Sequence, residues 1–489
     1  MSLIREIRSD PNRFRGIQEA RFKDPAVVDR ILELDQRAVA QDFLSSKYNQ
    51  FKNLITKQVG QNKRDPTQFK QITQLTIQSD PTSGAMNVDT IFEIVVRHLR
   101  DGRSNDAVEL LGRIDSDVLQ DISRKIDREA TQLMGPDFKG ERDSLLNSLG
   151  NALHASVPVA KNEDHNAVVC VVDQKNKLSY DKRPDETQLL GHVELCGRLG
   201  IVDTDHGIRL MGNRGYFLCG LGVKLNMALM TYAMDFLERR GHRQMSVPHF
   251  LNQEVVEKLC QLQEFDETLY KVTDEESKTK YLIATSEQPL TGFYRDHKFK
   301  PGELPVKFAG LSTCYRKETG RHGVDTLGIF RVHQFEKVEQ LCLTEADDSW
   351  ACLEQMLQNA RDFYDSLGIS YRVVNIVSGA LNNSASLKYD LEGYFAKSGT
   401  YKELVSCSNC TDYFSRKLNI KDRRGNWVHI LNATLCANTR TLCAILEQWQ
   451  TAEGVIIPPV LRPYMHDYPL TYLPFPMAPP RRSPAQETA

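Results

Sequence analysis

Charged and aromatic residues that suit a nucleotide site gather in two strand-like runs in the second half of the chain. Arg316 and Glu318 end the first run. The second run carries Arg331, Phe335 and Glu339 at mostly even spacing. Residues two apart on a strand share one face, so each run should present these side chains together. Guanidinium groups suit phosphate, a phenyl ring suits a base and carboxylates suit amines. This inventory predicts a site that holds a nucleotide beside an amino acid.

A simpler alternative is a surface β-hairpin with solvated charges. Arg-x-Glu alone does not separate the two interpretations. The whole block of residues 308–339 is harder to explain as a hairpin, because a solvated hairpin needs neither His333 and Phe335 on its second strand nor glycines at both ends of its loop.

Two shorter patterns have competing interpretations. Thr285 and Glu287 follow a strand-like run and could hold an ammonium group, although a helix cap gives the same local pattern. Cys407 and Cys410 form a Cys-x-x-Cys pair, but they supply only two of the four ligands that zinc needs. No second pair follows at zinc-finger spacing, so we predict neither a metal nor a redox role for the two cysteines.

The block of residues 308–339 resembles motif 2 of class II aminoacyl-tRNA synthetases. The string RVHQFEKVE, from Arg331 to Glu339, resembles the seryl-tRNA synthetase form. Residues 225–248, a predicted long helix, strand and proline, resemble motif 1, which forms the dimer interface in that family. Residues 429–447, a predicted strand, turn and helix, resemble motif 3. The resemblance covers nearly the whole chain.

The resemblance implies a role for each matching residue. Arg316 would bind the α-phosphate and the serine carboxylate, and Arg440 would stack over adenine opposite Phe335. A local salt bridge at a helix start is the simpler alternative for Arg440. Glu403 and Ser406 would hold the Mg²⁺ that bridges the ATP phosphates, since Mg²⁺ prefers oxygen ligands. The implied catalytic residues are Arg316 and Arg440; the ATP-binding residues are Arg316, Glu318, Arg331, Val332, Phe335, Glu403, Ser406 and Arg440; the serine-binding residues are Thr285, Glu287, Arg316, Glu339, Asn432 and Thr434.

The implied reaction is in-line attack of the serine carboxylate on the α-phosphorus of ATP, followed by transfer of serine to tRNA. A carboxylate is already a nucleophile at neutral pH, so catalysis should rest on positioning and charge stabilisation. Two residues depart from the family pattern. Phe414 stands where glutamine is usual, and we expect a consequence for packing but no loss of activity. Asn438 replaces a commoner small residue or threonine, and it receives no role.

The elements before this site form a predicted helical arm. Residues 24–59 carry apolar residues at steps of three and four, which predicts a long helix with a narrow coiled-coil seam. A second helix is predicted over residues 105–134 and a short third over 144–154, with a loop-rich insertion at 61–102. The predicted seam of the first helix is Val27, Ile31, Leu34, Ala38, Leu44, Tyr48, Phe51 and Ile55.

The alternative for this arm is a dimerisation coiled coil or a scaffold. The local positive charge slightly favours nucleic-acid binding instead. Residues 1–70 hold 14 Lys and Arg against 9 Asp and Glu, a net of +5. Lys47, Lys52 and Lys57 lie near one flank, which could follow a phosphate backbone. The region resembles the seryl-tRNA synthetase arm that grips the variable arm of tRNA(Ser) across the dimer. The string RFKDP at residues 21–25 resembles the eukaryotic cytosolic branch.

Composition sets the remaining bounds. The 489 residues carry a net charge of −2, so any RNA contact must be local. No apolar run approaches a membrane span, and no signal-peptide core begins the chain. Eleven cysteines along a large chain favour a reducing compartment, which predicts the cytosol and no membrane.

We therefore predict an α+β fold: an antiparallel helical arm at 1–155, a class II catalytic domain at 156–465 and a Pro-rich tail at 466–489. The predicted family is a homodimeric seryl-tRNA synthetase that uses ATP and Mg²⁺. Alternatives are a threonyl or prolyl synthetase, a ligase that loads a carrier protein, and an inactive scaffold. Zinc ligands near the pocket would favour a threonyl enzyme. Absence of the arm would favour a carrier-protein ligase, and loss of the arginine set would favour an inactive scaffold. The sequence does not decide whether tRNA(Sec) is also a substrate.

Overall fold

The structure is a computed structural model whose parts form two compact units. One unit comprises Met1–Arg15 and Asp24–Ser148, and the other comprises Gly16–Lys23 and Leu149–Ala489. The residues described are 3–64, 116–133, 135–174, 188–260, 268–273, 278–319, 327–465 and 471–475, with 93, 94, 97, 101, 106, 111 and 114.

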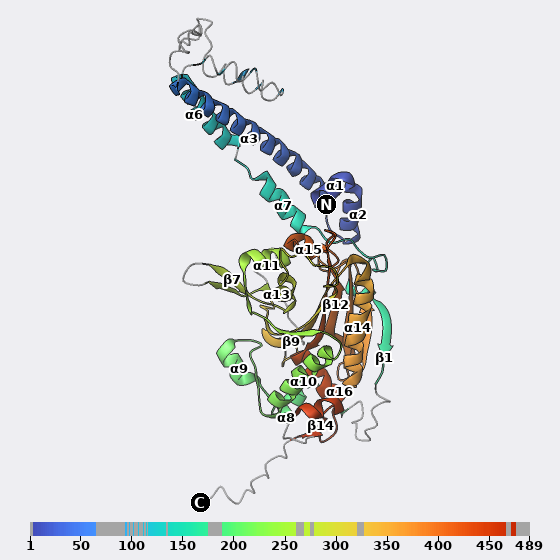
Figure 1. The fold of residues 1–489 in the computed structure, drawn as a ribbon. Helices are drawn as coiled ribbons and strands as arrows, with labels where there is room; N and C mark the ends of the chain where they lie inside the picture. Colours follow the sequence, from blue (N-terminus) through green and yellow to red (C-terminus); the bar gives the residue numbers. More distant parts are fainter. Residues whose placement is uncertain are drawn as a thin grey trace, which may run out of the picture. The chain divides into compact units, whose positions relative to one another are not determined.

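The first unit is built around a helix of 39 residues, α3 (Ala26–Arg64), which packs against α6 (Ser116–Leu133) and α7 (Phe138–Ser148) (Figure 1). Arg30, near the start of α3, forms an ion pair with Glu141 of α7, and Lys52, further along α3, forms one with Asp127 of α6. The residue number of the partner falls as that of the α3 residue rises. The helices therefore run antiparallel, which confirms the predicted arm. The shorter α1 (Leu3–Ser9) and α2 (Pro11–Ala20) precede α3.

The predicted seam of α3 is largely confirmed, with one correction at its start. Val28 is fully buried, whereas Val27 is only partly buried, so the stripe begins one residue later than predicted. The side chain of Leu44 lies outside the described residues. The remaining predicted seam residues are buried: Ile31, Leu34, Ala38, Tyr48, Phe51 and Ile55.

The two later helices of the arm differ from the prediction. Ile114 lies at a bend, so the predicted helix over 105–134 is interrupted and the described part begins at Ser116. The third helix covers Phe138–Ser148 instead of 144–154. Its early start follows from Asp137, whose carboxylate accepts a hydrogen bond of 2.8 Å from the Gly140 amide and so caps the helix. Most of the predicted insertion at 61–102 lies outside the described residues.

The second unit contains an eight-stranded sheet with the order β1-β10-β11-β12-β13-β9-β8-β4. All neighbouring pairs are antiparallel except β4 with β8. This arrangement confirms the predicted α+β fold. The strands are β1 (Ala167–Val172), β4 (Arg243–Ser246), β8 (Val306–Tyr315), β9 (Gln334–Thr344), β10 (Tyr371–Asn375), β11 (Leu387–Phe395), β12 (Thr400–Asn409) and β13 (His429–Ala437).

Helices α10 (Leu221–Glu238) and α14 (Ser349–Ser366) pack against the sheet, and α14 runs along it (Figure 1). Alternation along β9 divides its side chains between the two faces. Val338 and Cys342 join the core shared with these helices, whereas Leu341 and Leu343 join a second core. Lys337 and Glu339 share the face of Leu341, which is the face that carries the site. The helix α16 (Asn438–Gln448) follows β13 directly.

Smaller elements complete the second unit. Helix α8 ends at Gly200, which is left-handed with a φ of 63°, as glycine readily allows. Within the described ranges, no helix is both long and apolar enough to cross a membrane. These elements are η2 (Glu163–His165), α8 (His192–Leu199), β2 (Val202–Asp203), α9 (Thr204–Met211), β3 (Phe217–Leu218), β5 (Phe250–Asn252), α11 (Gln253–Leu259), β6 (Lys271–Thr273), β7 (Thr279–Leu282), α13 (Glu287–Gly292), η5 (Ala346–Asp348), α15 (Tyr413–Leu418), β14 (Gly454–Ile456), η6 (Pro459–Met465) and β15 (Tyr472–Pro474).

Candidate active site

The two predicted strand-like runs correspond largely to β8 and β9, which pair antiparallel and bring the charged residues together. Cys314 lies opposite Phe335 in the register, and the Arg316 amide donates a hydrogen bond of 2.9 Å to the His333 carbonyl. The second run is shorter than predicted, because β9 begins at Gln334 and Arg331 lies before the strand. Arg331 therefore reaches the site from a connecting segment.

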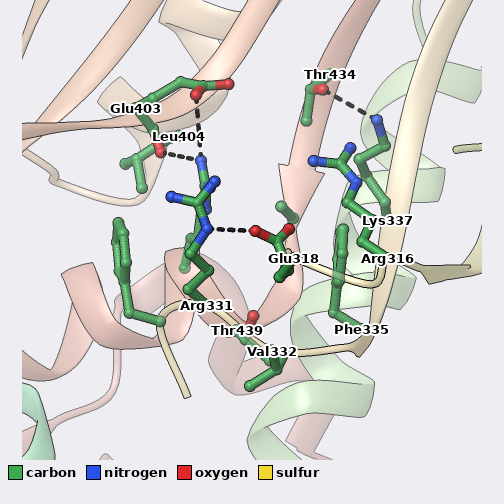
Figure 2. A pocket seen from close by; sticks show the side chains of 13 residues that line it. Arg316, Glu318, Arg331, Val332, Phe335, Lys337, Glu403, Leu404, Thr434 and Thr439 are labelled. Carbon is green, nitrogen blue, oxygen red and sulfur yellow. Dashed lines mark hydrogen bonds and ion pairs between the residues drawn. The ribbon is translucent and has the colours of Figure 1, made fainter. Parts of the chain in front are cut away.

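A pocket opens where β8 and β9 meet β12 and α16 (Figure 2). It contains both predicted catalytic residues, Arg316 and Arg440. Of the eight predicted ATP-binding residues, only Ser406 is not part of its lining. The lining comprises Arg316, Glu318, Phe330, Arg331, Val332, Phe335, Lys337, Glu403, Leu404, Thr434, Ala437, Thr439 and Arg440.

Glu318 stands at the centre of the positive charges in this pocket. The Nε of Arg331 donates a hydrogen bond to its carboxylate, as Figure 2 shows. Burial by itself would raise the pKa of Glu318, but this hydrogen bond and the charges of Arg331, Arg316 and Arg440 lower the pKa below its ordinary value. Glu318 therefore stays ionised at neutral pH and can accept hydrogen bonds from an amine.

Arg440 of α16 and Glu403 of β12 form a second charged pair. The Nη1 of Arg440 donates a hydrogen bond of 3.0 Å to the Glu403 carbonyl and lies 3.4 Å from its carboxylate. Burial would raise the pKa of Glu403, but the charges of Arg440, Lys388 and Arg316 hold it well below its usual range. Glu403 is thus an ionised oxygen donor at the edge of the pocket.

Each of the two arginines predicted to be catalytic lies near an aromatic ring. The guanidinium of Arg316 is 5.2 Å from the centre of the Phe335 ring, and that of Arg440 is 5.1 Å from the Phe330 ring. Phe330 had no predicted role. Its position directly before Arg331 was the feature of the sequence that could have placed it in the pocket.

A buried polar cluster lies beside Arg316 and Phe335. The Nζ of Lys337 is 2.6 Å from the Glu339 carboxylate, and the Thr434 hydroxyl donates to the same carboxylate at 3.2 Å. Lys337 is 5% exposed and Glu339 is 1% exposed. Lys337 and Thr434 line the pocket, whereas Glu339 stands directly behind them. Lys337 lies between Phe335 and Glu339 in the second charged run and had no predicted role.

Further hollows extend the site toward α13. Thr285 and Glu287 line one hollow with Asn382 and Ser384. A larger hollow shares Thr285 with this one, and it shares Arg316 with the pocket between β8, β9, β12 and α16. The predicted serine-binding residues therefore lie along one continuous sequence of hollows, except Glu339 and Asn432. Asn432 lies behind the lining and donates a hydrogen bond of 2.7 Å to Glu287.

The start of α13 carries local hydrogen bonds, but its N-cap residue, Ser286, makes no side-chain cap bond. The Thr285 hydroxyl accepts a hydrogen bond of 3.2 Å from the Glu287 amide, and the Gln288 side chain accepts one of 3.0 Å from the Ala284 amide. These two bonds hold the start of α13 next to the hollow that Thr285 and Glu287 line.

The two departures from the family pattern have structural explanations. Phe414 is buried in the second core with Val428 and Ile430, and it also lines the hollow that contains Thr285. The Asn438 side chain accepts a hydrogen bond of 3.0 Å from the Glu336 amide and donates one of 2.8 Å to Asn226. Asn438 thus connects the start of α16 to β9 and α10, a role that the sequence did not reveal.

Cys407 and Cys410 are buried, and burial raises the pKa of each thiol. Cys410 is 3.8 Å from the Asn432 side-chain oxygen, and Cys407 contacts a backbone carbonyl of α14. Among the residues that the structure describes, no group of three or more His, Cys, Asp and Glu side chains is arranged to hold a metal ion.

Comparison with protein families gives the class of this fold and site. Residues 270–449 match the tRNA synthetase class II core domain (G, H, P, S and T), and residues 1–81 match the seryl-tRNA synthetase N-terminal domain. The chain is a class II aminoacyl-tRNA synthetase, an aminoacyl-tRNA ligase.

Individual relatives narrow the class to one family. The chain is 40% identical to the cytoplasmic serine–tRNA ligase of Schizosaccharomyces pombe, covering 98% of this chain and 96% of that protein. It is similar to the crystal structure of the cytoplasmic serine–tRNA ligase of Naegleria fowleri in complex with AMP, with a TM-score of 0.76, 40% identity and coverage of 96% and 97%. It also resembles seryl-tRNA synthetase from Pyrococcus horikoshii complexed with ATP, with a TM-score of 0.72, 30% identity and coverage of 97% and 99%. The chain belongs to the seryl-tRNA synthetase family.

Proposed function

We propose that this chain is a cytosolic serine–tRNA ligase. It activates serine with ATP, which forms seryl-adenylate and releases pyrophosphate, and then transfers serine to the 3′ end of tRNA(Ser). The observation that carries this proposal is the placement of Arg316 and Arg440 in one pocket that adjoins the hollow of Thr285 and Glu287.

Adenylate formation needs two anions to approach each other. The serine carboxylate is the nucleophile and needs no general base, but it must meet the negatively charged α-phosphate. Arg316 lines both the nucleotide pocket and the adjoining hollow, so its planar fork can bind carboxylate and phosphate oxygens together. Arg331 and Arg440 supply further positive charge within the same pocket. Fixed charges at this position stabilise the transition state without reorganisation.

The site also fits a divalent cation that accompanies ATP. Mg²⁺ prefers oxygen ligands, and the low pKa of Glu403 keeps an ionised carboxylate at the pocket edge. Glu403 would hold the ion with Ser406, which lies three residues further along β12. Bound Mg²⁺ would neutralise charge on the ATP phosphates.

Specificity for serine would arise from the polar cluster of Glu339, Thr434 and Lys337. A serine hydroxyl would form a hydrogen bond with a polar group of this cluster. When alanine binds, that polar group would lack the partner. Such a site can reject the analogue without the hydroxyl by roughly 10⁴-fold. Thr285 and Glu287 would receive the substrate ammonium group, and threonine would be excluded by its bulk.

Binding of tRNA(Ser) would use the helical arm. Lys47, Lys52 and Lys57 lie along α3, where they can follow a phosphate backbone. Assembly as a homodimer would cover apolar side chains of α9 and α10. Met227 is 60% exposed and Leu210 is 79% exposed, so both side chains are available to such an interface.

Pyrophosphate exchange measured with each of the twenty amino acids tests the assignment. We expect rapid exchange with serine alone, together with charging of serine tRNA. Exchange with threonine or proline and none with serine would identify a different class II synthetase. Exchange with serine but no charging of any tRNA would favour a carrier-protein ligase.

A further inference from the structure

A loop formed by residues 379–386 borders the amino acid end of the site. Asn382 and Ser384 on this loop line the hollow that contains Thr285 and Glu287. The loop has no regular secondary structure, so its shape depends on contacts from elsewhere. One of its ends is fixed by a hydrogen bond of 2.8 Å from the Ser386 amide to the Asn409 carbonyl.

Arg21 holds the centre of this loop from a distant part of the sequence. Its Nη1 donates a hydrogen bond of 3.2 Å to the Asn382 carbonyl, and its Nη2 donates one of 2.5 Å to the Ala385 carbonyl. Its Nε donates a third bond of 2.9 Å to the Asn151 carbonyl. Arg21 is only 2% exposed. All three groups of the guanidinium are therefore used on backbone carbonyls.

The surroundings of Arg21 are built for a buried guanidinium. Within the described residues, no carboxylate forms an ion pair with Arg21, and burial lowers its pKa to about 10. The chain carries Gly150 beside it, where a Cβ atom would lie 2.5 Å from the Arg21 Cδ and 2.6 Å from its Nε. Burying a charge without an acidic partner is costly. The three backbone carbonyls that accept hydrogen bonds from the Arg21 guanidinium offset this cost.

Asn151 extends the same network into the loop. Its side-chain amide donates a hydrogen bond of 2.9 Å to the Ser384 carbonyl, and its backbone amide donates one of 2.7 Å to the Asn383 carbonyl. Arg21 and Asn151 together therefore bond to the backbone of four successive loop residues: Asn382, Asn383, Ser384 and Ala385.

We propose that Arg21 is a positioning residue for the amino acid end of the active site. Its guanidinium fixes the backbone of residues 382–385, so that Asn382 and Ser384 keep their places beside Thr285. The identity of the ligand as serine rests on the proposed function. Arg21 lies in Gly16–Lys23, which belongs to the catalytic unit although residues of the arm precede and follow it.

Kinetics of the full-length protein separate positioning from general stability. We expect Arg21→Met to raise the KM for serine in pyrophosphate exchange at least tenfold, because small displacements of binding groups are costly. The KM for ATP should change less than about twofold, because Arg21 does not touch the nucleotide pocket. Arg21→Lys should give an intermediate serine KM, since an ammonium lacks the planar fork. Equal changes in both KM values, or an unchanged serine KM in folded protein, would overturn the proposal.

A matched control and a second route to the same defect complete the test. Arg142→Lys removes another half-buried guanidinium, 2.9 Å from Asp35 in the arm, and should leave both KM values unchanged. Gly150→Ala keeps Arg21 but displaces its guanidinium, so it should raise the serine KM as Arg21→Met does. A raised serine KM in Arg142→Lys would contradict a role specific to Arg21.

Backbone hydrogen exchange tests the loop without any enzymatic activity. In Arg21→Met, peptides that cover residues 379–386 should exchange at least tenfold faster than in the wild type, whereas peptides from β8 and β9 should not. Unchanged protection of the loop would overturn the proposal. If the wild type gave no serine-dependent exchange of pyrophosphate, the proposed function would fail, and loop protection would still decide the role of Arg21.

Discussion

The Nη1 of Arg440 lies 3.4 Å from the carboxylate of Glu403 and also donates to the backbone carbonyl of the same residue. The first residue is near the start of α16 and the second is on β12, so this pair fixes the two walls of the nucleotide pocket relative to each other. The charge of Arg440 also lowers the pKa of the Glu403 carboxyl, so Glu403 stays ionised.

Glu403→Gln should weaken the use of Mg²⁺ while it leaves the backbone contact to Arg440 in place. An amide oxygen is a poorer ligand for a hard cation than a carboxylate is. We expect the Mg²⁺ concentration that gives half-maximal pyrophosphate exchange to rise about tenfold or more. An unchanged Mg²⁺ dependence would remove Glu403 from the proposed metal site.

Arg316→Ala should reduce serine-dependent pyrophosphate exchange by at least ~10²-fold, the usual cost of losing one preorganised charge donor. Arg295→Ala serves as the control, since Arg295 forms an exposed ion pair with Glu254 outside the pocket and its loss should cost little. Near-normal exchange in Arg316→Ala would contradict the role of Arg316.

Thr434→Val should reduce the discrimination between serine and alanine. Valine keeps the shape of threonine but leaves the Glu339 carboxylate without the hydroxyl bond of 3.2 Å. We expect the ratio of kcat/KM for serine over alanine to fall at least tenfold. Thr344→Val, on the same sheet but outside the site, should keep the ratio of the wild type.

Replacing residues 24–134 with a short flexible linker should preserve adenylate formation and abolish tRNA charging. The deletion removes most of the helical arm but retains Gly16–Lys23, which belongs to the catalytic unit. Removing residues 1–134 should additionally raise the KM for serine, because Arg21 is then lost. Equal loss of exchange and charging in the first deletion would show that the arm is not separable.

Buried His242 should make stability depend on pH. Burial and the charge of Lys307 lower its pKa from 6.5 to about 4 in the folded protein, so folding favours the neutral ring. This contribution is complete above about pH 6.5 and is lost as the pH falls toward 4, by up to about 3 kcal/mol. His242→Gln should therefore flatten the fall in unfolding free energy over this window. The unfolding free energy is measured by urea titration at each pH. If it fell equally in the wild type and in His242→Gln between pH 6.5 and 4, the role of His242 would be refuted.

Local patterns in the sequence were sufficient for the paired strands β8 and β9, for the long helix α3 and for the passage from β13 into α16. Hydrophobic periodicity and the spacing of charged residues carry this information. The predicted starts of the third arm helix and of the α3 seam were slightly wrong, because a single side chain decides where each begins. The third arm helix starts early because Asp137 caps it, and the α3 seam begins at Val28 because only one of two adjacent valines is fully buried.

Contacts between distant parts of the sequence could not be predicted in this way. Phe330 beside Arg440 and the bond of Asn438 to Asn226 depend on three-dimensional placement, and no local pattern marks them. Arg21 was recognised only as part of a sequence resemblance. Its partners lie 130 to 364 positions later, where no periodicity connects them. Glu339 and Asn432 were expected to touch substrate, yet each lies behind a residue that does line a hollow.

Asn226 and Met227 are neighbours on α10 that differ in exposure: Asn226 is buried and Met227 is exposed. The first donates a hydrogen bond of 2.6 Å to Glu336, the residue after Phe335, and the second is 60% exposed. Asn226 therefore ties an exposed stretch of α10 to the strand that supplies Phe335 to the pocket. In the homodimer that we propose, a displacement of β9 on ligand binding would reach the subunit interface through this one hydrogen bond.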